Sequence, residues 1–220
     1  MCGRFTITVT LDELKHYLQK SFDIDLSDTF FDLPRYNVAP GQDVIALIHD
    51  GQKFRVGLLK WGFHQFQQKP MINARSETAF RLPSFKESFM SKRCLVLADG
   101  FYEWMSKESK KQPMRIIKKD RGLFPIAGLY QSIQIESGKK EHQVILLTTQ
   151  ANERLESIHS RMPVIIDEQN AIDWLYPKQE NVQKLIHLMK PYHSDLIDVY
   201  PASQKVNDAT YDQPDCIRKQ

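Results

Sequence analysis

The chain has 220 residues, of which 41% are hydrophobic and 26% charged, and its formal net charge is +3. This composition predicts an ordinary folded protein with enough apolar material for a sizeable core, most economically in one domain. It excludes a bilayer-spanning helix, because the longest apolar runs are far too short, and no secretory signal is visible at the start. The weak net charge permits a nucleic-acid partner on a local basic face but does not by itself indicate one.

The first predicted element is a helix. Thr10 opens a capping box with Glu13 at the third helical position, and apolar residues at helical spacing follow (Leu11, Leu14, Tyr17, Leu18). Residues 43–62 then read as two strands joined by a turn at Asp50-Gly51, which is a strong hairpin signal.

Further strands are predicted in five segments that turn residues separate: 93–98, 101–104, 113–119, 123–130 and 142–149. Short helices are predicted at 151–158, 167–175 and 179–189, the last ended by Pro191. Because strands come first and helices lie late and at the edges, the predicted fold class is α+β. We expect a single domain over residues 1–220, with a mostly antiparallel, barrel-like sheet and peripheral helices.

Two segments are predicted to lie outside these strands and helices. The tail at about 207–220 is expected to be flexible, with Cys216 in a frayed position. The polar segment 106–112 is predicted to be a mobile loop whose lysines form a solvated face rather than a binding patch.

The chain begins MCGRF, and Cys2 is the first candidate for chemistry. A small second residue usually allows the initiator methionine to be removed, after which Cys2 carries a free α-amine beside its thiol. With a pKa near ~7.7–8.0, this amine is far more often neutral at pH 7 than a lysine. A neutral amine forms a Schiff base with an aldehyde, and the neighbouring thiol can then close a five-membered thiazolidine ring intramolecularly.

The structural alternative for Cys2 is that it is incidental or a small buried hydrophobe. The chain holds 3 cysteines (Cys2, Cys94, Cys216), an odd number without paired spacing. This set fits a reduced cytosol better than a disulfide framework.

Glu103 lies in the segment DGFYEW, where a strand would place Phe101 and Glu103 on one face and Tyr102 and Trp104 on the other. A carboxylate among aromatic side chains is a candidate for a raised pKa and for acid–base catalysis. The alternative is a glutamate at the rim of an edge strand.

Two further segments carry polar residues at alternating positions. In INARSET, Asn73 can orient a polar substrate and Arg75 can bind a phosphate, unless the segment is simply an exposed strand with a salt bridge. In SIHSRMPVII, an extended backbone places His159 and Arg161 two residues apart, a proton shuttle beside a phosphate ligand. A lone histidine is otherwise more often a structural hydrogen-bonding group.

The sequence predicts neither a metal site nor a cofactor. The remaining histidines are scattered, without the spacing of a zinc site, and neither a Walker loop nor a G-x-G-x-x-G motif is present.

Six segments in order (MCGRF, RYNVAP, LKWGF, INARSET, RCLVLADGFYEW, HSRMPVII) resemble the SRAP family of abasic-site processing proteins. The resemblance runs from residue 1 to about residue 166, with a weaker echo in YPASQKVNDATYDQPDCI. It implies a single SRAP domain that recognises abasic sites in single-stranded DNA and crosslinks to them covalently through Cys2. It also implies removal of Met1 by a peptidase-like activity, together with lyase-type incision and reversal of the crosslink.

The resemblance also implies a role for individual residues. Cys2 matches the nucleophile, Asn73 the residue that holds the N-terminus and the opened sugar, Glu103 the acid–base carboxylate, and His159 the proton shuttle. Two further groups match DNA-binding positions: phosphate ligands (Arg4, Arg75, Arg161, and less firmly placed Arg81) and the wall of the DNA channel (Pro40, Trp61).

Two departures from the family pattern leave the DNA path open. Phe66 stands where many relatives carry tryptophan, and Gln204 and Lys205 stand where relatives often have a basic residue. We expect Trp61 and Phe66 to stack on bases, at roughly 1–3 kcal/mol per base. The implied partner is single-stranded DNA with abasic sites, including junctions with duplex. We expect no membrane partner, and we expect the protein to be a monomer. The expected location is the cytoplasm, with nucleoid association on DNA.

Two other functions remain open at this point. N-terminal-nucleophile glutamine amidotransferases also begin with Cys-Gly, and there the α-amine would act as base to its own thiol. The other alternative is a non-covalent single-strand DNA-binding module in which Cys2 is incidental. A glutaminase assay, a denaturing gel with abasic DNA and Cys2→Ala discriminate among the three.

Overall fold

A computed structural model of the chain describes residues 2–26, 29–64, 70–107, 110–135, 137–178 and 181–220. Its α-helices and strands are, in order, β1 (Phe5–Ile7), α1 (Leu11–Phe22), β2 (Arg35–Val38), β3 (Asp43–His49), β4 (Phe54–Trp61), β5 (Asn73–Arg75), α2 (Ser76–Ala79), α3 (Pro83–Ser91), β6 (Arg93–Ala98), β7 (Gly100–Lys107), β8 (Lys110–Lys118), β9 (Phe124–Gln134), β10 (Lys140–Gln150), β11 (Arg161–Pro163), α4 (Ala171–Leu175), α5 (Val182–Leu188) and β12 (Ile197–Pro201). Short 3-10 helices are η1 (Glu168–Asn170), η2 (Ser194–Leu196), η3 (Gln204–Asn207) and η4 (Pro214–Ile217).

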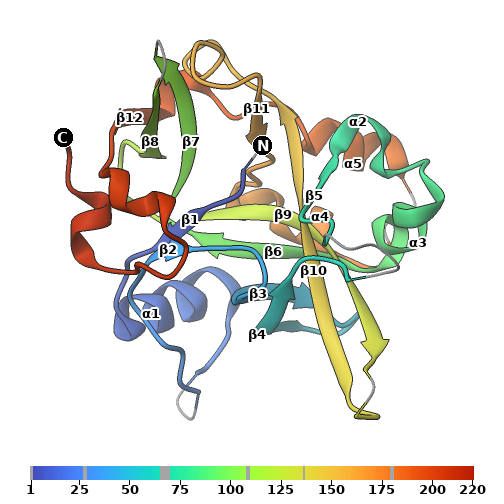
Figure 1. The fold of residues 1–220 in the computed structure, drawn as a ribbon. Helices are drawn as coiled ribbons and strands as arrows, with labels where there is room; N and C mark the ends of the chain where they lie inside the picture. Colours follow the sequence, from blue (N-terminus) through green and yellow to red (C-terminus); the bar gives the residue numbers. More distant parts are fainter. Residues whose placement is uncertain (1, 27–28, 65–69, 108–109, 136, 179–180) are drawn as a thin grey trace.

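Five strands form a closed barrel at the centre of the fold (Figure 1). The order is β10-β4-β3-β6-β9, and the ring closes because β9 also pairs with β10. All of its pairings are antiparallel except β4 with β10. The side chains of β6 and the middle of β10 are buried throughout, as in strands covered on both faces. The predicted α+β class with a largely antiparallel, barrel-like sheet is confirmed.

A second sheet packs beside the barrel in the order β12-β8-β7-β1-β2. Its strand β7 has two buried faces: Phe101 belongs to the main core, whereas Tyr102 belongs to a smaller cluster with Ala202, Val206 and Cys216. This matches the predicted alternation in FYEW. The second sheet therefore joins the two ends of the chain, since β1 and β12 are both among its strands.

The predicted first helix and the predicted hairpin at Asp50-Gly51 are confirmed. Thr10 caps α1 in a capping box with Glu13, and the helix ends at Asp23, whose φ of 52° is left-handed. The buried face of α1 (Leu14, Leu18, Phe22) belongs to the main core, and the ring of Phe22 lies 5.2 Å from that of Phe54 at the start of β4. Gly51 has a φ of 100° in the β3–β4 turn, a conformation that favours glycine.

The late helices are only partly as predicted. Residues 153–158 form successive turns rather than a helix, held by hydrogen bonds such as Glu156 N–H to Asn152 O at 3.0 Å. The Asn152 side chain is one reason, because its oxygen accepts from Leu155 N–H and its amide donates to Tyr192 O. The other two predicted helices are present but shorter, as η1 with α4 and as α5.

The C-terminal tail contradicts the expectation of a frayed end. Cys216 is completely buried, and the carboxylate of Asp212 accepts hydrogen bonds from the backbone N–H groups of Tyr36 and Asn37. The buried Asn37 amide in turn donates to Tyr211 O at 2.8 Å. The tail is thus folded against β2, where it covers backbone groups that would otherwise lack partners.

Candidate functional site

The N-terminal segment is positioned by pairing of β1 with β7. Phe5 lies opposite Phe101 and Thr6 opposite Gly100, and Tyr102 N–H donates to Arg4 O at 3.0 Å. Continuing this antiparallel register places Gly3 opposite Glu103. A hydrogen-bonded strand therefore carries the start of the chain to the predicted acid–base carboxylate. In Figure 1 the N-terminus lies between the β7–β8 hairpin and β11.

Cys2 is completely buried at the end of this strand. Its Sγ lies 3.8 Å from Arg4 O, to which the thiol donates. Burial raises the pKa of the Cys2 thiol far above its ordinary value, and the negative charge of Glu103 raises it further. The sulfur is therefore held as the neutral thiol, with little thiolate at neutral pH.

Asn73 joins β5 to the N-terminal segment. Its amide Nδ2 donates to the backbone oxygen of Cys2 at 2.9 Å. Its Oδ1 is buried and has no hydrogen-bond partner among the residues that the structure describes. Since a buried acceptor without a donor is costly, Oδ1 marks a place where an N–H or O–H group would be stabilised.

Glu103 is 4% exposed, on β7. Burial raises the pKa of its carboxyl group above the usual value, and nearby positive charge, including that of His159, opposes the rise. The predicted rise in pKa is confirmed. A glutamate of this kind can hold or release a proton nearer neutrality than an exposed one, as general acid–base chemistry requires.

His159 follows the turns that replace the predicted helix and stands just before β11. Its Nδ1 accepts a hydrogen bond from the backbone N–H of Arg161 at 2.9 Å. When neutral, this imidazole therefore carries its proton on Nε2. The structure brings His159 and Glu103 together on the wall of one hollow of about 650 Å³.

The walls of this hollow include residues that the sequence analysis did not assign to the site. They are Trp104, Lys110, Lys111, Gln204 and Asn207. This was predictable in part, because strands were predicted on both sides of residues 106–112. In the structure these strands, β7 and β8, form a hairpin in which Ser106 pairs with Lys111, so Lys110 and Lys111 lie beside FYEW. Assigning 106–112 to a solvated loop missed this pairing. For η3 the signal was the family resemblance, which marked Gln204 and Lys205 as standing where relatives often have a basic residue.

The arginines predicted as phosphate ligands fall into two pairs. Arg4 and Arg161 are already engaged: Arg4 donates to Asn37 Oδ1 at 2.8 Å and to Val206 O, and both Nη atoms of Arg161 bind the Glu77 carboxylate. Burial lowers the pKa of Arg4, and the negative charge of Asp208 opposes this.

The second pair is exposed. Arg75 ends β5, and Arg81 lies beside the ring of Phe80, with 6.0 Å from its guanidinium carbon to the ring centroid. The extended reading of INARSET is correct only for Asn73–Arg75, because α2 begins at the next residue.

The predicted stacking on Trp61 is wrong. The indole is completely buried: its ring lies 5.3 Å from that of Phe5 and its Nε1–H donates to Ile72 O at 3.0 Å. A base therefore has no access to its face. Pro40 is partly exposed in the turn after β2, and the prediction for Phe66 lies outside the described residues.

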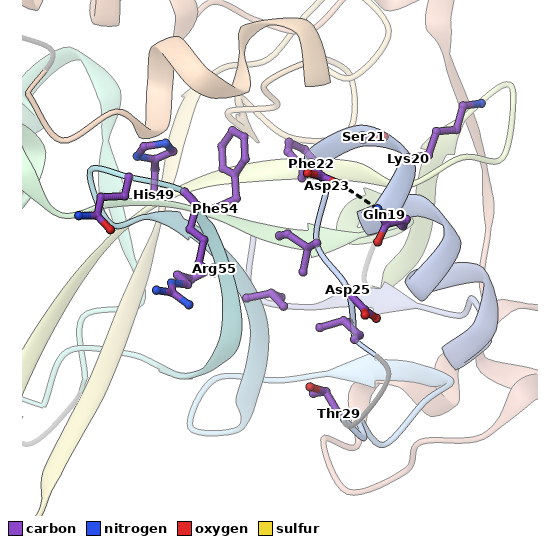
Figure 2. A pocket seen from close by; sticks show the side chains of 15 residues that line it. Gln19, Lys20, Ser21, Phe22, Asp23, Asp25, Thr29, His49, Phe54 and Arg55 are labelled. Atoms are coloured by element: carbon purple, nitrogen blue, oxygen red, sulfur yellow. Dashed lines mark hydrogen bonds between the residues drawn. The ribbon is translucent and has the colours of Figure 1, made fainter.

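A second hollow, of about 1010 Å³, is lined by none of the predicted site residues. Figure 2 shows it between the C-terminal end of α1 and the β3–β4 hairpin, with Lys20 on one side and His49, Phe54 and Arg55 on the other. Across the described residues, three or more His, Cys, Asp or Glu side chains nowhere gather as a metal site would require. The described helices also include none with the length and apolar character needed to cross a membrane.

Residues 1–209 match the family model described as SOS response associated peptidase (SRAP). The chain belongs to the SRAP family. It is 39% identical over 226 residues to the abasic site processing protein YoqW of Bacillus subtilis (strain 168), covering 99% of each chain. It is 30% identical over 177 residues to YedK of Escherichia coli (strain K12), also named an abasic site processing protein, covering 80% of this chain and 79% of that protein.

The fold is shared more widely than the sequence. A crystal structure of a protein from Bacteroides thetaiotaomicron superposes with a TM-score of 0.83, covers 100% of both chains and is 23% identical. A phage-related protein from Bordetella bronchiseptica superposes with a TM-score of 0.74 at 25% identity, covering 93% of this chain and 95% of that one.

Proposed function

We propose that this SRAP protein processes abasic sites in single-stranded DNA by forming a covalent crosslink through Cys2 after removal of Met1. The observation that carries the proposal is the convergence of Cys2, Asn73, Glu103 and His159, which come from four separate segments. Relatives named abasic site processing proteins support the substrate class. No metal or cofactor is required.

In the first step, the α-amine of Cys2 attacks the aldehyde carbon of the ring-opened sugar. The carbon–nitrogen bond forms as the carbonyl oxygen takes a proton, and the resulting carbinolamine loses water to give an imine. Glu103, with its raised pKa, supplies the proton for the departing hydroxyl. Oδ1 of Asn73 accepts a hydrogen bond from the amine or from a sugar hydroxyl.

In the second step, the Cys2 thiol adds across the imine. The sulfur bonds to the carbon and the thiol proton passes to nitrogen, by way of the Glu103 carboxylate, so that the whole reaction releases one water. Because burial keeps the sulfur as a neutral thiol, amine attack comes first. His159, whose Nε2 carries the proton when the ring is neutral, donates to the sugar oxygen during ring opening and reversal.

The same site accounts for Met1 removal and for lyase activity. Glu103 would activate water for the peptide bond that precedes Cys2, and the imine is the intermediate from which strand incision proceeds. We place this activity in a monomeric, single-domain protein of the cytoplasm. Its three cysteines are buried and unpaired, which fits a reducing compartment.

Intact mass spectrometry and a denaturing gel with an abasic oligonucleotide test the proposal. We expect loss of Met1, an adduct one water lighter than its two components, and a band that resists denaturant. Cys2→Ala should abolish that band, and the matched variant Cys216→Ala should retain it. The same band in Cys2→Ala, or ammonia release from glutamine by the wild-type protein instead of a band, would contradict the mechanism.

A further inference from the structure

We infer that Lys110 and Lys111 bind a backbone phosphate of the DNA strand beside the lesion. This inference rests on the proposed function and names a subsite of the same site. Both lysines lie at the start of β8 and line the hollow that also holds Glu103 and His159. A strand whose sugar reaches that acid–base pair brings its neighbouring phosphate to the same walls.

The ammonium groups of the two lysines can bind an anion. Both ammonium groups are exposed, and neither has an ion-pair partner among the described residues. By contrast, two cations close in sequence to residues that line the hollow already have partners: both Nη atoms of Arg161 bind the Glu77 carboxylate, and Lys205 pairs with Asp215 at 2.7 Å. Within the part of the chain that the structure describes, an incoming phosphate therefore has no carboxylate to displace from these lysines.

The wall that carries the lysines is held by a chain of hydrogen bonds. Trp104 Nε1–H donates to Asn207 Oδ1 at 2.7 Å, and Asn207 Nδ2 donates to Gln204 Oε1 at 2.9 Å. Gln204 Nε2 then donates to the backbone oxygen of Lys111 at 3.2 Å. The backbone from which the lysines project is therefore fixed relative to the site, which lowers the ordering cost of binding.

Salt dependence of binding tests the assignment. Each phosphate contact on a single strand contributes about 0.7 to the slope of log Kobs against log salt, so the double variant Lys110→Gln/Lys111→Gln, which loses the contact to one phosphate, should lower the slope by about 0.7. Between 50 and 200 mM salt, wild type should lose about 2.6-fold more affinity than the variant. Undamaged single-stranded DNA is the probe, which isolates binding from chemistry.

Lys20→Gln/Lys53→Gln is the matched control, because it removes the same charge from the other hollow (Figure 2). It should leave the slope near the wild-type value. If both double variants shift the slope equally, or neither does, the subsite is wrong. Failure of wild type to crosslink would instead overturn the proposed function and leave the slope result standing.

Discussion

Replacing Asn73 tests how the start of the chain is held for reaction. Its Nδ2 donates to Cys2 O at 2.9 Å, and Cys2 is completely buried, so Asn73→Ala leaves a buried carbonyl without this donor. A buried unsatisfied group costs about 1–3 kcal/mol. If the whole cost is added to the activation free energy of crosslinking, the crosslinking rate drops by about 5- to 150-fold.

The assay is the single-turnover rate of crosslink formation on an abasic oligonucleotide, with Tm measured on the same samples. Because the end of the chain can loosen without global unfolding, Tm should fall by less than the about 2–12 °C that 1–3 kcal/mol would give in a protein of this size. Asn73→Asp keeps the shape, removes the donor and should be at least as slow. Wild-type rates in both variants, at an unchanged Tm, would refute the positioning role.

Three further variants follow from the structure. Because burial raises the pKa of Glu103, the free energy of unfolding contains a contribution that is lost as pH rises through that raised pKa; Glu103→Gln should abolish this loss in pH-dependent denaturation and should slow crosslinking. Glu77→Gln should tighten binding to undamaged single-stranded DNA at low salt, because it frees the Arg161 guanidinium for phosphate. Gly100→Ala should lower stability by about 1–3 kcal/mol in thermal unfolding, since a Cβ there would lie 2.7 Å from Thr6 Oγ1.

Each of these predictions has a contradicting outcome or a control variant. An unchanged pH profile in Glu103→Gln would contradict the burial argument. For Glu77→Gln the control is Glu87→Gln, which removes a carboxylate from the exposed pair with Lys92 and should leave DNA affinity unchanged. Equal effects of Glu77→Gln and Glu87→Gln on DNA affinity would contradict the specific role of Glu77. Gly57→Ala, where a Cβ would meet nothing within 4 Å, should not lose stability.

The sequence by itself determined the features that depend on neighbours along the chain. The α1 cap, the β3–β4 hairpin and the alternation in FYEW follow from hydrogen bonds and side-chain periods within a few residues. The chemical reading of Cys2 also needed only the residue and its place in the chain. The family was recognisable because its motifs occur in a fixed order, and the family match is confirmed.

Only the tertiary structure decided which side chains are buried, which already have hydrogen-bond or ion-pair partners, and which are exposed. Burial made Trp61 a core residue instead of a stacking surface, and a carboxylate on α2 occupied Arg161. The fold also brought Lys111 and Asn207 to the same wall, although 96 positions separate them in the numbering. Pairing of strands, closure of the barrel and packing of the tail against β2 are long-range events, so residue type and spacing do not encode them locally.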